Sequence, residues 1–259
     1  MISSQSLKLV HFFPEHMNIY GDMGNIIALR KRCEWRGISV EYIPINTRGD
    51  FDHISVGDLF FFGGGQDADQ MRVWQVISEN NTLFARLTEE AVNDDKVFLL
   101  VCGGYQMFGK YFIDGSGTLI PGLGILDIET VAPSSKVSGR CIGNVVIRTE
   151  LPLEPQTIVG FENHGGQTHF LKESKKSMQY LGKVVEGHGN DLKNGYEGCL
   201  YRNVIGSYLH GSLLPKNPHL ADYIIAKALS VKYHDEVILS PLDDALEKQA
   251  HEAALQLTI

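Results

Sequence analysis

A short apolar run that ends in two glycines constrains this chain more than any other segment. Val97–Val101 is a run of five apolar residues, which predicts a strand buried on both faces, as in a parallel sheet. The run stops at Cys102, and Gly103 and Gly104 precede an apolar stretch over residues 107–112 that we expect to be helical. A strand, a sharp glycine turn and a helix form a nucleophile elbow, which lifts one side chain above the sheet. A thiol there faces the positive end of the helix dipole, which favours the thiolate.

The alternative is that Cys102 is a small buried packing residue, as many cysteines are. The two glycines directly after it favour a nucleophile. An oxyanion hole requires close approach of the backbone on that side of the cysteine, whereas packing does not. We therefore interpret Cys102 as the candidate nucleophile.

Composition excludes several classes of protein. The chain has 43% hydrophobic and 21% charged residues, as in an ordinary globular protein. Its net charge of −8 and the lack of a Lys/Arg-rich stripe argue against nucleic acid as a partner. No apolar run approaches the roughly 18 residues of a membrane span, so we expect no transmembrane segment. Residues 1–8 contain no basic segment followed by an apolar one, so we expect no signal peptide. The four cysteines form no Cys-x-x-Cys pair, so we expect no zinc site. They are also too few and too widely spaced for a disulfide scaffold, which indicates a protein of the reducing cytoplasm.

The order of apolar segments predicts the fold class. The expected strands are residues 7–13, 39–45, 58–62 and 97–101, with a helix that Asn25 caps and Gly37 ends, and helical patterning over residues 66–94. This β-α-β-β-α-β-α order predicts an α/β protein with an open, doubly wound, mostly parallel sheet flanked by helices.

Beyond residue 115 the pattern becomes β-rich. Short strands are expected at residues 124–131, 141–149, 157–162, 184–186 and 204–208. The chain then closes with helices at residues 217–233 and 241–255, the first with Asn217 as its N-cap and Pro218 in its first turn. We interpret the β-rich region as flanking or extending the sheet, so that residues 1–259 form a single domain.

A second strand ends in glycines, at residues 63–65. Ligands bind beyond the carboxyl ends of parallel strands, so the backbone amides of Gly64, Gly65 and Gly103 are candidates for binding one oxygen of a substrate. A flexible turn and a phosphate loop are the alternatives. No Lys follows these glycines and no Gly-x-x-x-x-Gly-Lys-Ser/Thr pattern occurs, which argues against the phosphate loop.

A cysteine nucleophile requires a histidine as its proton partner. Of the ten histidines, His210 follows the strand-like residues 204–209 and precedes Gly211. It is therefore at a strand end, as Cys102 is. His164, in an Asn-His-Gly-Gly loop, is the second candidate, and spacing along the chain does not decide between them.

Two motifs resemble those of a known family. Residues 102–109, Cys-Gly-Gly-Tyr-Gln-Met-Phe-Gly, resemble the nucleophile motif of class I glutamine amidotransferases, in particular of the cobyric acid synthase-like branch. Residues 208–211, Tyr-Leu-His-Gly, resemble the histidine motif, and the glycines at 63–65 resemble the oxyanion loop. The resemblance spans about residues 58–212 in ordered motifs.

The resemblance implies a reaction. Cys102 is expected to attack the side-chain amide of L-glutamine, His210 to be the catalytic histidine, and Gln106 to line the site. This sequence departs from the family pattern at one position. Many class I members have a Glu two residues after the histidine, where this chain has Ser212. The missing acid is then expected from Glu197, from another residue of this chain, or from a partner subunit.

Within this branch, residues 18–25 and 160–166 resemble the glutaminase subunits of lipid II isoglutaminyl synthases. That resemblance implies that Arg140 binds the glutamine carboxylate. It also implies that ammonia passes to a Mur ligase-like synthetase subunit (MurT type), which binds ATP and amidates D-glutamate of the lipid II stem peptide. We expect no cofactor in this chain, and a location near the inner face of the membrane through lipid II.

Three other functions remain open from the sequence. A cobyric acid-type amidation subunit has the same catalytic motifs and differs only in the acceptor. Another cysteine hydrolase of the same fold, such as a peptidase, is the second alternative, and a non-catalytic subunit that keeps the motif as structure is the third.

Overall fold

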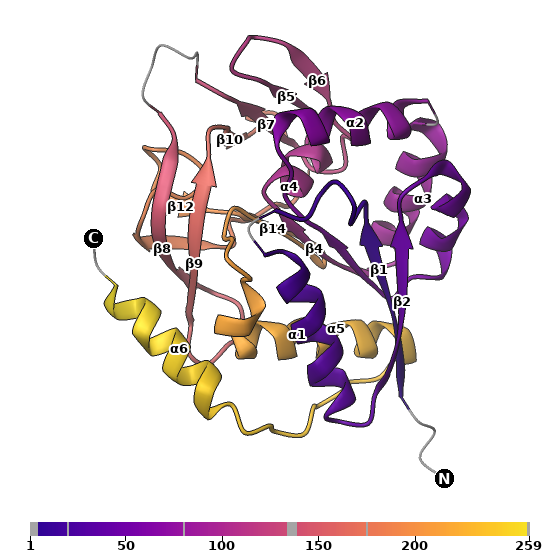
Figure 1. Cartoon of the computed structure of the whole chain (residues 1–259), viewed down its shortest axis with the longest axis vertical. Coiled ribbons are helices and arrows are strands. Elements are labelled where there is room, and N and C mark those ends of the chain that lie inside the picture. The colour runs from indigo at the N-terminus through magenta and orange to yellow at the C-terminus, as the bar shows by residue number, and fades with distance from the viewer. Residues whose placement is uncertain (1–4, 20, 80, 134–138, 175, 258–259) are drawn as a thin grey trace.

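The computed structural model describes residues 5–19, 21–79, 81–133, 139–174 and 176–257. Tyr20, within the motif at residues 18–25, lies outside the described residues. A six-stranded sheet with the strand order β13-β14-β4-β3-β1-β2 forms the centre of the fold (Figure 1). Its strands are β1 (Ser6–Phe12), β2 (Ser39–Ile45), β3 (Leu59–Phe62), β4 (Val97–Val101), β13 (Cys199–Tyr201) and β14 (Val204–Ser207). All neighbours are parallel except the edge pair β13 and β14, which confirms the predicted fold class.

Helices cover both faces of this sheet. They are α1 (Met23–Glu34), α2 (Asp67–Ser78), α3 (Asn81–Asn93), α4 (Gly103–Phe108), α5 (Pro218–Tyr233) and α6 (Ala245–Gln256), with 3-10 helices η1 (Arg48–Val56) and η2 (Leu214–Lys216). Helices α1 and α5 pack on each other, while α2, α3 and η1 pack together on the opposite side (Figure 1). Within the described residues, no helix combines the length and the apolar character of a membrane span.

The carboxyl ends of three strands meet at one edge of the sheet. Phe62 at the end of β3 lies opposite Leu100 of β4, and Ser207 at the end of β14 lies opposite Val101. The glycine loop after β3, the turn after β4 and the segment after β14 therefore leave the sheet at neighbouring points.

The β-rich extension forms two further four-stranded sheets, ordered β10-β7-β5-β6 and β12-β11-β8-β9. Their strands are β5 (Tyr111–Ile113), β6 (Leu119–Pro121), β7 (Ile128–Val131), β8 (Cys141–Thr149), β9 (Thr157–His164), β10 (Gln167–Phe170), β11 (Gly182–Glu186) and β12 (Tyr196–Glu197). The antiparallel pair β8–β9 lies beside the central sheet, because Phe161 of β9 pairs with His210 beyond β14 (Figure 1).

Two local predictions were wrong. Helix α1 begins at Met23 with Asp22 at the N-cap position, so Asn25 does not cap it. Asn25 lies in the first turn, and its Oδ1 accepts a hydrogen bond from Leu214 N–H at 2.9 Å. The amide that favours an N-cap in the sequence thus holds η2 instead.

The apolar stretch over residues 107–112 is also not one helix. Helix α4 ends at Phe108, and Gly109 is extended at φ −69° and ψ −175°. Lys110 N–H then donates to Ile128 O at 2.8 Å, and the chain continues as β5, which pairs with β7. Tertiary pairing with β7 therefore overrides the helical pattern.

The core between the sheet and α3 is aromatic. Phe60 and Phe98 on neighbouring strands stack at 4.3 Å, and Phe12 contacts Phe84 of α3 at 5.2 Å between ring centroids.

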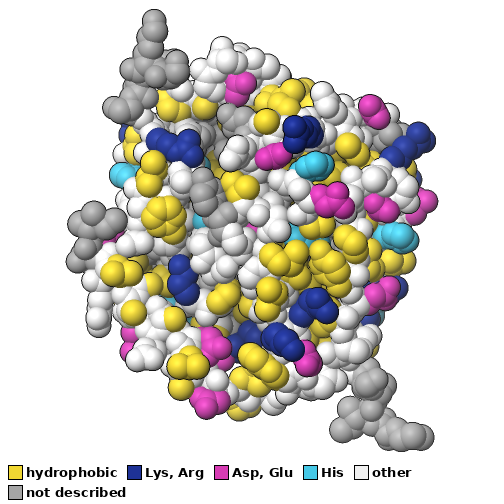
Figure 2. Space-filling view, in the orientation of Figure 1, with side chains coloured by type: hydrophobic (Ala, Val, Ile, Leu, Met, Phe, Trp, Pro, Cys, Tyr) yellow, Lys and Arg dark blue, Asp and Glu magenta, His cyan; other side chains and the backbone are white. Residues whose placement is uncertain are grey.

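On the face of the molecule drawn in Figure 2, the described Lys and Arg side chains are interspersed with Asp and Glu side chains.

A buried arginine ties the C-terminal part of the chain to α1. The Arg32 side chain is 3% exposed. Its guanidinium donates to Asp222 of α5 at 2.6 and 2.7 Å, and to Asp244 at the N-cap of α6 at 2.6 and 3.0 Å. Bidentate pairs of this kind are among the stronger hydrogen bonds in proteins.

The first prediction concerns this network. Arg32→Ala leaves the partly buried Asp244 without its partner and Asp222 with Arg36 alone, and should lower the free energy of unfolding by about 3 kcal/mol. Arg86→Ala removes an exposed ion pair with Glu90 and should change it by less than about 0.5 kcal/mol. Urea denaturation measures both variants, and equal effects would contradict a structural role for the Arg32 network.

Candidate active site

Cys102 lies on a sharp turn between β4 and α4. Its backbone has φ +51° and ψ −107°, a region that residues other than glycine rarely adopt. Cys102 N–H donates to Ser207 O at 2.8 Å, and Gly104 N–H donates to Gly63 O at 3.0 Å. The predicted elbow is therefore present, and such local strain is typical of functional positions.

Gly104 lets the elbow pack directly on β3. A Cβ atom at this position would lie 2.5 Å from Phe62 O, which is too close for any side chain. The two strand ends that carry glycines therefore touch, as their positions in the sequence predict.

Gly64 lies between Cys102 and His210. A Cβ atom added to Gly64 would be 3.2 Å from Cys102 Cβ and 2.9 Å from His210 Cε1. His210 N–H donates to Phe161 O at 2.7 Å, which fixes the segment after β14 against β9. The structure thus brings Cys102 and His210 together beside Gly64, where a larger residue would collide with both.

The pKa of His210 is raised above its usual value. The side chain is fully buried, and burial alone lowers the pKa because it penalises the imidazolium. Attraction to Cys102 and to the Asp22 carboxylate outweighs burial and raises the pKa to about 10. The imidazolium is therefore favoured near neutral pH, as expected for the partner of a thiolate.

Asp22 is a site residue to which the sequence analysis assigns no role. Its Oδ2 accepts the Gly64 N–H at 2.6 Å, and its Oδ1 lies 3.9 Å from His210 Nδ1. The available signal was its place in a loop with two glycines directly after the first strand. Its contact with His210 joins segments 188 positions apart in the chain, which local patterns do not reveal.

Gly65 and Gly103 share the neighbours Met17 and Gln70. A Cβ atom at Gly103 would lie 2.8 Å from Met17 Cε and 2.9 Å from Gln70 Nε2. Gln70 Nε2 donates to Gly65 O at 3.1 Å and so fixes the loop. Among the hydrogen bonds of the described residues, neither Gly65 N–H nor Gly103 N–H is a donor. These two amides can therefore bind an oxyanion, whereas Gly64 N–H is already bound to Asp22.

Gln106 lies in the first turns of α4 and is 4% exposed. Its N–H donates to Cys102 O at 3.0 Å, and its side-chain Nε2 donates to Tyr208 Oη at 3.1 Å. The Tyr208 hydroxyl also bonds to Thr168 Oγ1 at 2.5 Å. Gln106 is thus held beside the elbow by a buried network of hydroxyl groups.

His164, the other histidine candidate, has a different environment. Its ring stacks on Tyr208 with 3.7 Å between centroids, and its Nδ1 donates to Gly166 O at 2.7 Å. Burial lowers the pKa of His164 to about 4, so the ring is neutral near pH 7. The geometry favours His210 over His164 as the partner of Cys102.

Arg140 lies directly before β8 and is exposed. Its Nε donates to Asn163 Oδ1 at 2.8 Å, and one terminal nitrogen lies 3.9 Å from the Cβ position of Gly165. Its charge contributes to the low pKa of His164. Among the described contacts, none joins Arg140 directly to Cys102. The described contacts therefore do not bring Arg140 together with the pair of Cys102 and His210, and its role in binding stays a prediction.

Glu197 and Ser212 do not provide a charged carboxylate next to His210. Glu197 is fully buried, and its Oε1 accepts hydrogen bonds from Tyr208 N–H and from Ser207 Oγ. Burial raises the pKa of Glu197 to about 8, so the protonated form is favoured near pH 7. Ser212 Oγ donates to Gly21 O at 2.6 Å.

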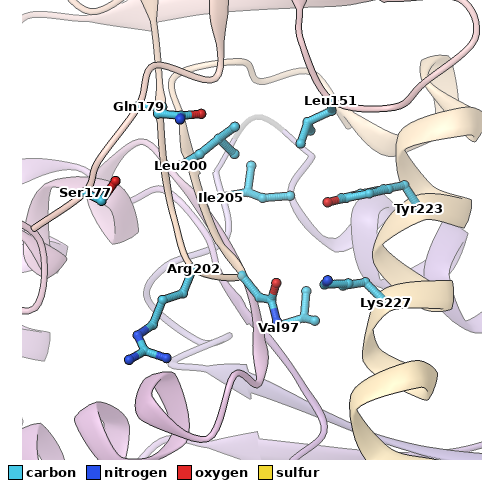
Figure 3. Close-up of a pocket in the computed structure, with 10 residues that line it drawn as sticks. Val97, Leu151, Ser177, Gln179, Leu200, Arg202, Ile205, Tyr223 and Lys227 are labelled. Carbon is cyan, nitrogen blue, oxygen red and sulfur yellow. The ribbon is translucent and has the colours of Figure 1, made fainter. Parts of the chain in front are cut away.

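A cavity of about 280 Å³ lies at the opposite end of the sheet. Val97, at the start of β4, and Ile205 line it, and Tyr223 and Lys227 extend toward them from α5 (Figure 3). Because Cys102 follows the other end of β4, this cavity is separate from the candidate active site. Among the described residues, no group of three or more His, Cys, Asp or Glu side chains is placed to hold a metal ion.

Known proteins with similar sequences point to one family. Residues 8–218 match the CobB/CobQ-like glutamine amidotransferase domain. Subunit GatD of the glutamine-hydrolysing lipid II isoglutaminyl synthase from Staphylococcus aureus (strain N315) is 40% identical over 228 residues, covering 87% of this chain and 86% of the relative. The GatD subunit from Streptococcus pneumoniae (strain ATCC BAA-255 / R6) is 36% identical over 246 residues, covering 95% and 89%.

A more distant relative, a probable cobyric acid synthase from Methanopyrus kandleri, is 34% identical over 140 residues, covering 47% of this chain and 25% of the relative. The family match and the two GatD relatives cover the elbow, the glycine loop and the segment that contains His210. The chain therefore belongs to the CobB/CobQ-like glutamine amidotransferase family, which confirms the resemblance of its motifs to class I glutamine amidotransferases.

Proposed function

We propose that this chain is the glutaminase subunit of a lipid II isoglutaminyl synthase and hydrolyses L-glutamine through a thioester on Cys102. The observation that carries the proposal is the position of Gly64, whose Cβ position lies within 3.2 Å of Cys102 Cβ and 2.9 Å of His210 Cε1. A cysteine and a histidine can act together on one substrate atom only when they lie side by side. The two GatD relatives, which cover most of this chain, support the choice of substrate.

The first half of the reaction forms the thioester. The Cys102 sulfur attacks the side-chain amide carbon of glutamine, and the electron pair of the C=O bond moves to the oxygen. His210, as the imidazolium, gives its proton to the amide nitrogen. The C–N bond then breaks, ammonia leaves, and the γ-glutamyl group remains on the sulfur.

The second half releases glutamate. Neutral His210 takes a proton from water, and the resulting hydroxide attacks the thioester carbon. The C–S bond breaks, glutamate leaves, and the Cys102 thiolate and the His210 imidazolium are restored.

The amides of Gly65 and Gly103 are the proposed oxyanion donors. Both lie beside the elbow, and neither is used as a donor within the described residues. A donor aimed at the developing charge is typically worth about 3 kcal/mol of transition-state stabilisation. Gln106, held next to Cys102 O, is proposed to line the same pocket.

A partner subunit is proposed to use the ammonia. The GatD relatives are named as subunits of a glutamine-hydrolysing synthase. We propose a Mur ligase-like synthetase of the MurT type as this partner, which binds ATP and amidates D-glutamate of the lipid II stem peptide to D-isoglutamine. Amidation of cobyric acid is the weaker choice, because this chain matches only 25% and 39% of the length of two cobyric acid synthase relatives, whereas it matches 86% and 89% of the two GatD relatives.

Replacement of the nucleophile tests the reaction. Cys102→Ala should abolish glutamine hydrolysis, measured as glutamate release by the chain alone and with its partner, because no other group can form the thioester. Hydrolysis retained in this variant would refute the mechanism, provided that its thermal unfolding matches that of the wild type.

Covalent labelling by a glutamine analogue with an electrophilic carbon tests the nucleophile independently, with the other three cysteines as internal controls. Burial raises the pKa of Cys33, Cys141 and Cys199 to about 12, so their thiols stay protonated and unreactive. Mass spectrometry of the labelled protein should therefore find the analogue on Cys102 alone.

The proposed role of Arg140 makes a separate prediction. Loss of a charged hydrogen bond to the glutamine carboxylate costs about 2 kcal/mol, so Arg140→Ala should raise the KM for glutamine about 30-fold and change kcat little. Arg148→Ala removes an exposed arginine at the far end of the same strand and should leave KM unchanged. A similar KM in both variants would remove Arg140 from the binding site.

A further inference from the structure

The strongest unassigned feature is the Asp22 carboxylate, because its two oxygens face two different parts of the site. The side chain is fully buried. Its Oδ2 accepts the Gly64 N–H at 2.6 Å, whereas its Oδ1 lies 3.9 Å from His210 Nδ1. One carboxylate thus connects the glycine loop after β3 with the histidine after β14.

The loop that carries this carboxylate is fastened to the histidine segment. Ser212 Oγ donates to Gly21 O at 2.6 Å, and Leu214 N–H donates to Asn25 Oδ1 at 2.9 Å. Gly21 and Asn25 flank Asp22 in its loop, and Ser212 and Leu214 follow shortly after His210. The effect of these bonds is to fix the distance between the carboxylate and the imidazole.

Within the described residues, the other titratable groups with an electrostatic effect on or from His210 are Cys102, His164 and Glu197. Cys102 is the nucleophile. His164 is neutral near pH 7, because burial lowers its pKa to about 4. Burial raises the pKa of Glu197 to about 8, and its Oε1 is bound to the backbone of Tyr208. Asp22 is therefore the carboxylate placed to act on His210 as an anion.

We propose that Asp22 is the positioning residue of this site: its carboxylate holds the Nδ1 edge of the His210 ring, leaves Nε2 for Cys102, and anchors the glycine loop through Gly64. The proposal rests on the proposed glutaminase function. A separation of 3.9 Å is too long for a hydrogen bond and short enough for strong ionic attraction. Catalytic hydrogen bonds are often long without substrate and shorten when it binds.

The second contact of Asp22 connects the base to the oxyanion loop. Because Gly64 N–H is bound to the carboxylate, the next amide, that of Gly65, is held in a fixed position relative to His210. A shift of the carboxylate would therefore disturb the orientation of the base and the oxyanion donors together.

The substitution Asp22→Asn removes the negative charge of the side chain and keeps its shape. The asparagine oxygen can still accept the Gly64 N–H, but no anion faces His210. We expect kcat for glutamine hydrolysis to fall by about 100-fold or more, because the ring loses its orientation and its tautomer control, while KM stays within about twofold, as expected when transition-state stabilisation alone is lost.

The pH profile gives a readout that a merely structural role would not move. The Asp22 carboxylate favours the His210 imidazolium, so its removal lowers the pKa of His210, and the ion pair with the thiolate is lost at lower pH. The alkaline limb of kcat/KM should therefore shift down by about one pH unit or more. A wild-type kcat and a wild-type alkaline limb in Asp22→Asn would overturn the proposal.

Glu197→Gln is the matched control, since it is equally buried and equally isosteric. Its amide oxygen can accept the bonds from Ser207 and Tyr208, so kcat and the alkaline limb should stay at wild-type values. If this variant, rather than Asp22→Asn, shows the loss and the shift, then Glu197 is the positioning acid and the proposal is wrong.

Two further measurements test the role of Asp22. The first needs no Asp22 variant, and the second does not depend on glutamine hydrolysis. In the wild-type protein, ¹⁵N NMR of His210, assigned by its absence in His210→Gln, should show Nδ1 protonated and a pKa well above 7; an ordinary value near 6.5 would overturn the role of Asp22. Alkylation of Cys102 by iodoacetamide, followed against pH in wild type and Asp22→Asn, tests the same shift without glutamine. If Cys102→Ala still hydrolyses glutamine, the proposed function fails, and the alkylation profile still tests Asp22.

Discussion

The site depends on the close approach of two backbones where β3 and β4 end. Gly104 N–H donates to Gly63 O at 3.0 Å, and a Cβ at Gly104 would lie 2.5 Å from Phe62 O. Hydrogen bonds and register hold parallel strands side by side, but only glycine permits the chains to stay in contact after both strands have ended. Because of this contact, Cys102 and the glycine loop lie side by side, and the absence of a side chain at Gly64 leaves room there for His210.

The parts of this arrangement that follow from local patterns were predictable from the sequence. The strands β2 and β4 have the predicted bounds, because continuous apolar or β-branched runs between turn residues are strong signals. Cys102 was predictable for the same reason, since the strand, the two glycines and the helix are consecutive. Local pattern failed where distant pairing decided the structure. Tyr111 and Phe112 continue the helical spacing that begins in α4, but they form part of β5 because β7 offers a partner strand.

Asp22 shows what local sequence patterns cannot provide. Apart from the two glycines of its loop, nothing in the local pattern separates it from any aspartate before a helix, and a residue at an N-cap position has a sufficient local reason to be Asp. The structure describes no hydrogen bond from its side chain to the helix it precedes, and its oxygens face Gly64 and His210 instead. Ser212 was equally uninformative as a residue type, although its hydroxyl fastens the Asp22 loop beside the histidine. Long-range contacts of polar side chains are set by the fold, so they become visible only when the sheet edge is assembled.

Burial explains why one carboxylate can dominate the electrostatics at His210. Removing ionisable groups from water favours their neutral forms, and this effect lowers the pKa of His164 to about 4 and raises that of Glu197 to about 8. Both neighbours are then mainly uncharged near pH 7, although both are ionisable. His210 keeps its proton under the same burial because Cys102 and Asp22 attract it. The low dielectric that keeps the surrounding groups neutral also strengthens these remaining attractions. The charge of the imidazolium therefore depends on Cys102 and Asp22, which both lie beside Gly64.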